Sequence, residues 1–407
     1  MPAVVSSPIP AALLKLGPLD ADRVADVRPY FDAVPDPRSR RGRWYALTAV
    51  LLMCAAAVVA GARNLDELAE WGERASCTLL LAIGIRGHPL GWRRTPSAAT
   101  IGRVLGAVDG DALDQAVGAY LADRHRVAAA SADAAGPPRT IAVDGKALKG
   151  SARLSAPRRH LLSAVTHDRV ATLAQVEVGA KTNETRHFKP LLAPLDLAGT
   201  VVTFDALHSV KANITWLVET KKAHYIAVIK PNQPTVYAQL DDLNWSAVDI
   251  QHTASTTGHG RRESRSIKTL AINDNLGGIA FPHARLALRV HRRRQQTGKK
   301  QTRETVYAVT SLDAHQSSPA ELAAAIRGHW SIEALHHIRD RTFAEDSSTV
   351  HTGSTPRAMA ALRNLAIGTL KILGADNIAK TTRTIRHQPT QALQILGILS
   401  NPDPHGT

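Results

Sequence analysis

The sequence has few cysteines and lacks the common zinc-protease pattern, and both shortages exclude classes of protein. Only Cys54 and Cys77 occur among 407 residues, so neither a disulfide framework nor a four-thiolate zinc site is possible. The pattern H-E-x-x-H is absent. Hydrophobic residues make up 44% and charged residues 21%, which excludes a disordered or collagen-like chain. We expect a reduced, cytoplasmic globular protein of two or three domains.

Acidic residues are outnumbered by basic ones, and long uncharged runs are nearly absent. The chain has 35 Asp and Glu against 50 Lys and Arg, a net charge of +15, which predicts a polyanionic partner, most commonly nucleic acid. One uncharged run, residues 44–62, is long enough to span a bilayer. Because it is rich in alanine and no signal-peptide pattern begins the chain, we predict a buried helix and no membrane contact.

Hydrophobic periodicity divides the chain into segments. Residues 1–24 form a proline-containing lead-in, and residues 25–128 have helical periodicity. An Ala-, Gly- and Pro-rich stretch then ends the helical region, and residues 139–375 alternate between strand-like and helix-like patterns. Within them, residues 232–313 read as a β-rich insertion in which two strands flank a very basic turn. Residues 376–407 are expected to be a C-terminal tail.

The order of strand-like and helix-like runs after residue 139 is typical of an α/β fold. Three strands, TIAVDGKAL, HLLSAVTHD and ATLAQVEVG, precede a helix-like stretch, and strand TVVTFDAL, helix VKANITWLVETKKA and strand HYIAVIKP follow. The continuous apolar run IAVIK suits the parallel part of a sheet. The sequence therefore predicts a mixed sheet flanked by helices.

Three acids stand where such a fold places ligands. Asp144 and Asp205 each follow an apolar strand, and the carboxyl ends of strands are where an open α/β sheet binds ligands. Taken singly, Asp144 also fits a glycine-supported turn, Asp205 a helix cap and Glu333 a solvated helix position. Together they form a hard-oxygen cluster that suits two Mg²⁺ ions about 4 Å apart. His336 and His337 are adjacent and point to different sides of a helix, so we predict no zinc site there.

Five motifs in order carry a family resemblance that covers residues 30 to 375. VDGK at 143–146, FDALHS at 204–209, YIAVIKPNQP at 225–234, GHGRRESR at 258–265 and RGHWSIEALHHIRDRTFAED at 327–346 resemble the ISAs-one (H-repeat-associated) family of bacterial insertion-sequence transposases. That family belongs to the DDE group, which has an RNase H-like catalytic core. The stretch around residues 32–72 resembles the family's N-terminal associated region.

The resemblance implies a function and assigns roles to residues. Asp144, Asp205 and Glu333 would be the catalytic acids and the ligands of Mg²⁺ or Mn²⁺, with two ions in the site. The implied reaction is cleavage of double-stranded DNA at the element's ends and strand transfer into target DNA. A homodimer or higher oligomer on DNA is expected, associated with the nucleoid when bound. Two rival functions remain: a catalytically inactive or domesticated DNA-binding relative, and a metal-dependent nuclease that performs no strand transfer.

The sequence departs from the family just after Glu333, where it is one residue shorter. Arg327 precedes the glutamate, and Arg339 or Arg341 stands in place of the family's lysine. Asp340 lies on the same helix face as Glu333, roughly 10 Å along the axis, so only one of these acids can be level with Asp144 and Asp205. We predict that Glu333 is the ligand and that the flanking arginines pair with Asp340.

Basic residues beside these motifs are the candidate phosphate contacts. Lys146 either contacts the scissile phosphate or is exposed, and we favour exposure. Trp330 is expected to be a core anchor. Charge runs also form simply solvated loops. The predicted DNA-binding residues are Lys146, Arg261, Arg262, Arg292, Arg293, Arg294, Arg327 and Arg339.

Overall fold

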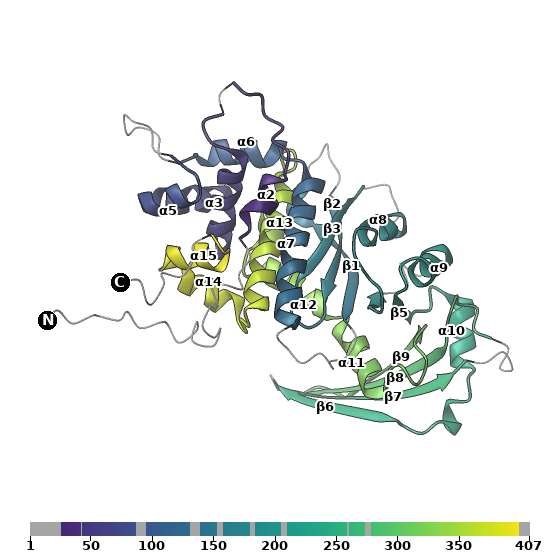
Figure 1. The fold of residues 1–407 in the computed structure, drawn as a ribbon. Helices are drawn as coiled ribbons and strands as arrows, with labels where there is room; N and C mark the ends of the chain where they lie inside the picture. The colour runs from purple at the N-terminus through teal and green to yellow at the C-terminus, as the bar shows by residue number, and fades with distance from the viewer. Residues whose placement is uncertain are drawn as a thin grey trace.

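The computed structural model describes residues 26–41, 43–86, 95–130, 139–152, 158–179, 184–204, 210–258, 260–272 and 278–398. These residues form a helical body, a central sheet with helices on both faces, and a projecting antiparallel arm (Figure 1). The sheet has nine strands in the order β3-β2-β1-β4-β5-β9-β8-β7-β6. The mixed α/β class predicted from the sequence is confirmed.

The first five strands have the arrangement of an RNase H-like core. They are β1 (Thr140–Leu148), β2 (Arg159–Thr166), β3 (Thr172–Val178), β4 (Val201–Phe204) and β5 (His224–Ile229). Strands β1, β2 and β3 are antiparallel neighbours, whereas β1, β4 and β5 run parallel. Strands β4 and β5 are joined through α9 (Lys211–Glu219), since parallel neighbours need a crossover connection. The strand order therefore agrees with the fold that the resemblance implied.

Helices cover both faces of this core, and strand alternation decides which side chains meet which layer. Ile141 and Val143 of β1 pack with α8 (Phe188–Leu192) and α9 (Lys211–Glu219). Ala142 packs toward the opposite layer, which contains α7 (Gly110–Ala130), α12 (Ser331–Arg341) and α13 (Thr355–Ile372). Helix α11 (Pro319–Gly328) precedes α12 on this side and begins with a Ser318–Glu321 capping box.

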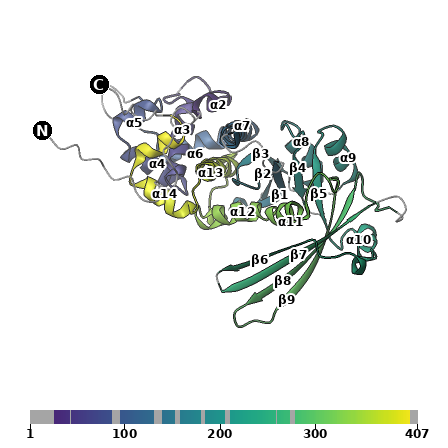
Figure 2. The same ribbon diagram turned by 60° about the horizontal axis from the view of Figure 1, so that its bottom comes forward.

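The β-rich insertion continues the same sheet. After α10 (Pro234–Asp241), it forms β6 (His252–Gly258), β7 (Arg261–Ala271), β8 (Leu286–Gln296) and β9 (Thr302–Thr310), which we call the arm. Strand β9 pairs antiparallel with β5 over four residue pairs, from Ile226–Thr310 to Ile229–Tyr307, so the arm is hydrogen-bonded to the core. Figure 2 shows the arm extending away from the helical body. The two predicted strands flanking a basic turn are β8 and β9.

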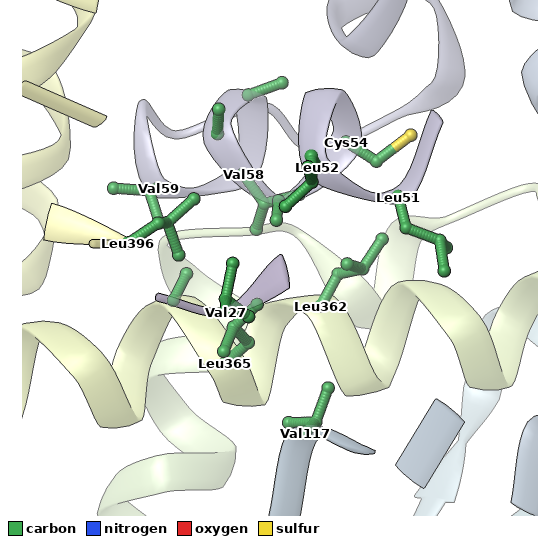
Figure 3. Close-up of a cluster of buried hydrophobic side chains, with 14 of the residues drawn as sticks. Val27, Leu51, Leu52, Cys54, Val58, Val59, Val117, Leu362, Leu365 and Leu396 are labelled. Atoms are coloured by element: carbon green, nitrogen blue, oxygen red, sulfur yellow. The ribbon is translucent and has the colours of Figure 1, made fainter. Parts of the chain in front are cut away.

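The N-terminal helices share one hydrophobic core with the C-terminal helices (Figure 3). They are α2 (Arg28–Asp32), α3 (Leu47–Val59), α4 (Leu65–Arg74), α5 (Cys77–Ala82) and α6 (Ala98–Ala107), with α4 capped by Asn64 and α6 by Ser97. Every residue of α3 except Thr48 is buried, which explains the uncharged run at 44–62. In the described part of the chain, no helix combines the length and the apolarity that crossing a bilayer demands.

Residues 376–398, which fall in the segment expected as a tail, contain two helices. These are α14 (Ile378–Arg386) and α15 (Pro389–Ile395). Ile385 and Leu393 are fully buried in the core that contains α3 and α13. The backbone N–H of Val27 also donates to the carbonyl of Leu396, so this end of the chain fastens the start of the helical body.

Candidate active site

Strand β1 positions Asp144 at the surface of the core. Ile141, Ala142 and Val143 are fully buried, and Asp144 follows them with its side chain 34% exposed. By strand alternation Asp144 shares the face of Ala142, which is the face covered by α12. The buried strand therefore delivers one carboxylate to a partly open position beside a helix.

The second predicted acid, Asp205, lies outside the described residues. It follows Phe204, the last residue of β4. Strand β4 is parallel to β1, and Phe204 is in register with Val143, the residue before Asp144. The two strands thus run toward the same edge of the sheet, which is where this class of fold binds ligands.

Helix α12 carries the third predicted acid, Glu333, and contacts β1 beside Asp144. Ile332 and Leu335 bury one side of the helix, whereas Glu333 in its first turn is exposed. One turn further on, His336 Nδ1 lies 4.0 Å from Asp144 Oδ2. Since residues three apart are neighbours on a helix, Glu333 lies one turn from the side chain that meets Asp144.

His336 has a role that the sequence did not reveal. Burial, with the charges of Arg339 and Lys146, lowers the pKa of His336 to about 3, so the imidazole beside Asp144 is neutral. Its Nε2 is buried and has no hydrogen-bond partner among the described residues. From the sequence, this histidine is a candidate for zinc binding alone. The signal in the sequence is its position three residues after Glu333, which puts both side chains on the same face of a helix.

Lys146 is buried, so the preference for an exposed side chain was wrong. Its side chain is 8% exposed, and Nζ donates to Asp340 at 2.8 Å. Asp346 lies 3.6 Å away and also pairs with Lys149 at 2.6 Å. The partner of Asp340 is therefore Lys146 and not the flanking arginines, because Asp340 faces β1.

Arg339 is also buried, which contradicts its prediction as a DNA contact. It is 0% exposed, and its Nε and Nη2 donate to the carboxylate of Glu345 at 2.9 Å each. Arg363 Nη1 donates to the same carboxylate at 2.9 Å. Arg339 follows Ile332 and Leu335 at helical spacing, so it lies on the apolar face of α12 and points into the protein.

Gly145 permits a carboxylate to approach β1 from the face opposite Asp144. A Cβ built on Gly145 would lie 2.7 Å from Oε1 of Glu184, so any side chain there would force the carboxylate to move. Glu184 begins the short helix η3 (Glu184–His187). Glu184 is not among the residues predicted from the sequence, although a glycine inside a strand pattern is a signal of close approach.

Two histidines fasten the junction of α11 and α12 to β4. Thr203 Oγ1 lies 2.9 Å from His167 Nε2 and 3.2 Å from His329 Nδ1. A Cβ at Gly328 would overlap the His167 ring, so only glycine allows this approach. Burial and the nearby His329 lower the pKa of His167 to about 4. The junction that precedes Glu333 is thus held by hydrogen bonds to Thr203, and the His167 imidazole among them is neutral.

The predicted basic residues of the arm differ in their surroundings. Arg261 and Arg292, together with Arg265, surround Glu263, which is 2% exposed. Arg265 and Arg292 also lie over the ring of Trp330, with Cζ 6.0 Å and 5.7 Å from its centroid. Arg262, Arg293, Arg294 and Arg327 are exposed.

The donors at this place suit a hard divalent ion. In the described ranges, no three His, Cys, Asp or Glu side chains group closely enough to hold a metal, but Asp205 is not in those ranges. Asp144 and Glu333 offer accessible carboxylate oxygens, which Mg²⁺ prefers. The neighbouring imidazole is neutral and Lys146 is already paired, so neither opposes a cation.

Comparison with known proteins assigns the family. Residues 135–368, more than half of the chain, match the family described as "Transposase DDE domain". The chain belongs to the DDE transposases. Residues 29–121 match the "DDE_Tnp_1-associated" family, which covers most of the N-terminal helices.

Relatives with transposase names span most of this DDE transposase. "Putative transposase YncI" of Escherichia coli O157:H7 is 26% identical over 84% of this chain and 86% of its own. "H repeat-associated putative transposase YhhI" of Escherichia coli K12 is 26% identical over 86% of this chain and 91% of its own. A piggyBac transposase synaptic complex with hairpin DNA aligns with 97% of this chain and 86% of its own, at 9% identity and TM-score 0.40. The fold assignment rests on the strand order and not on that last likeness.

Proposed function

We propose that this DDE transposase cleaves DNA at the ends of an insertion sequence and joins the released 3′-hydroxyls to target DNA. Asp144, Asp205 and Glu333 are the proposed catalytic acids. The observation that carries the proposal is the position of Asp144, which leaves a buried central strand of an RNase H-like core and faces the helix that bears Glu333.

The three carboxylates would hold Mg²⁺ or Mn²⁺, as two ions. When bound, such ions activate a water for attack on a phosphodiester and stabilise charge on the leaving 3′ oxygen. The protein contributes positions and charge. The Lys146–Asp340 ion pair joins β1 to α12 and so fixes where Glu333 lies along β1 relative to Asp144. The imidazole of His336 lies beside Asp144, with Nδ1 4.0 Å from Oδ2, and so helps to position that carboxylate.

DNA is the proposed partner because the chain is strongly basic and several of the predicted arginines are exposed. Arg327 lies at the end of α11, two residues before the His329 contact to β4, and Arg262 and Arg293 lie on the arm. Such side chains bind phosphates and set register and affinity. Cutting two ends and joining them to one target requires two active sites, so we propose at least a homodimer on DNA.

The test uses linear duplexes that carry the DNA flanking the gene, with Mg²⁺ and a plasmid target. We expect 3′-hydroxyl ends and joined products from the wild type, and neither from Asp144→Asn, Asp205→Asn or Glu333→Gln. Each variant should still bind the duplex. Asp242→Asn, an isosteric change at the exposed residue that follows α10, is the control and should retain activity.

The same assay separates the rival functions. Pre-cleaved ends with free 3′-hydroxyls that are never joined would identify a nuclease without strand transfer. Binding of the duplex with no cleavage by the wild type would identify an inactive DNA-binding relative. Near-wild-type cleavage by any one of the three variants would remove that acid from the site.

A further inference from the structure

The register of the arm sorts its basic residues onto two opposite faces. Arg265 pairs with Arg292, and Arg292 with Glu304, so these side chains and their second neighbours Glu263 and Arg294 share one face. This inner face packs against α11 and Trp330 through residues such as Ile267 and Val290. The alternate positions form the outer face, which is turned away from α11.

The two faces of the arm differ in how their arginines are paired with acids. On the inner face, three arginines are held by Glu263, and Arg292 also approaches Glu304 at 3.4 Å. On the outer face, no paired position of β6, β7, β8 or β9 is acidic. None of its four arginines has an ion pair with a residue that the structure describes; they are Arg262, Arg289, Arg293 and Arg303.

Three of the four outer arginines lie close to one another. Arg293 is directly opposite Arg303 in the β8–β9 ladder, and Arg262 lies diagonally across the β7–β8 ladder. Burial, then the charges of Arg293, Arg289 and Arg303, lower the pKa of His291, which lies between them. Arg289 is four residues from Arg293, about 13 Å along the strand. That distance spans several phosphates of a nucleic acid strand.

The rest of the outer face fits a phosphate backbone better than bases or another protein. Beyond its base, its other side chains are short hydroxyls and an amide, including Ser264, Ser266, Gln295 and Thr305. The ring of Tyr307, at the end of the arm that joins the core, packs against the rings of Trp245 and Tyr237. With no free aromatic side chain, the face has no platform for stacking single-stranded bases. With no apolar area, it has no core for a protein interface.

We infer that the outer face of the arm binds the backbone of double-stranded DNA through Arg262, Arg289, Arg293 and Arg303. Arg289 and Arg303 join the predicted DNA contacts on this ground, whereas Arg261 and Arg292 serve the structure of the arm. The inference rests on the proposed function, and it adds a DNA-binding surface separate from the acids. Because the outer face is turned away from α11, its DNA segment differs from the one that reaches Asp144.

The test measures how the affinity for a random-sequence duplex depends on salt, without metal ion. The variant carries Arg262→Ala, Arg293→Ala and Arg303→Ala. Losing three phosphate contacts should make the negative slope of log affinity against log salt shallower by about 2.7. The control carries Arg74→Ala, Arg103→Ala and Arg126→Ala, three exposed arginines of the helical body that remove the same net charge. We expect its slope to match the wild type.

Each result decides the inference. An unchanged slope in the outer-face variant, or an equal fall in the control, would overturn it. So would a fall seen only with single-stranded DNA or RNA. Thermal unfolding at the wild-type temperature excludes a folding defect. If the wild type cleaves its own ends but the outer-face variant has the wild-type salt dependence, the inference fails and the proposed function stands. If the wild type does not cleave but the outer-face variant has a weaker salt dependence, the inference stands and the proposed function fails.

Discussion

Glu345 should be among the most costly residues of the chain to replace. Its carboxylate is 3% exposed and receives hydrogen bonds from two guanidinium groups, Arg339 of α12 and Arg363 of α13, which are 0% and 2% exposed. Although burial opposes ionisation, these two arginines hold the pKa of Glu345 below its usual range. The carboxylate therefore carries a full charge that two buried cations need.

Removing one partner of a buried ion pair costs about 3–5 kcal/mol, because the remaining charge stays buried without compensation. Glu345→Ala leaves two such charges, so we expect a loss near the upper end of that range, measured by urea unfolding at pH 7. Glu70→Ala is the control. Glu70 pairs with Arg74 at 3.2 Å on an exposed helix surface and should cost below about 1 kcal/mol.

A second result follows from where the arginines lie. Arg339 is on the helix that carries Glu333, so the loss of Glu345 should also lower cleavage activity under conditions where the variant is folded. Replacing all three residues together, Arg339→Met, Glu345→Leu and Arg363→Met, should recover most of the stability. A Glu345→Ala protein within 1 kcal/mol of the wild type would refute the reasoning.

Three further outcomes are expected. Gly145→Ala places a methyl group 2.7 Å from the carboxylate of Glu184, and because that group is the far end of a flexible side chain the change should cost below about 1 kcal/mol in urea unfolding; a larger cost that vanishes in a Glu184→Ala background would show that the carboxylate is held rigidly in place. His167, whose pKa falls to about 4 when folded against about 6.5 unfolded, stays neutral while the unfolded chain takes up a proton. Stability should therefore be complete above pH 6.5 and fall by up to about 3 kcal/mol toward pH 4, and His167→Gln should flatten that dependence. Asp340→Asn should retain partial cleavage, since it loosens the ion pair between β1 and α12, while Glu333→Gln abolishes it; equal and complete loss in both would put Asp340 among the ligands.

The strands could be predicted from local patterns because their burial is continuous. The expected run TIAVDGKAL coincides with β1, and the run around IAVIK is β5, parallel to β4 as its unbroken apolar pattern indicates. The start of α6 also depends on local residues, because the Ser97 side chain accepts from the N–H of Thr100, three residues on. These features depend on neighbours in the sequence, and so the sequence contains them.

The burial of charged residues could not be predicted in the same way. Lys146 meets Asp340 across 194 positions, and Arg363 meets Glu345 across 18. A lysine or arginine read alone is expected at the surface, and only the fold supplies the partner that allows burial. The same holds for His336, whose contact with Asp144 depends on how α12 lies across β1.

The pairing of β9 with β5 bears on how this enzyme can be engineered. Strand β5 has β4 on one side and β9 on the other, so residues 232–313 supply the hydrogen bonds that close its outer side. A chain cut back to a minimal catalytic core would expose that row of N–H and C=O groups, together with the apolar Ile226. An open, apolar strand of this kind invites pairing between molecules. Shortened versions should therefore keep β9 and trim only the far ends of β6, β7 and β8.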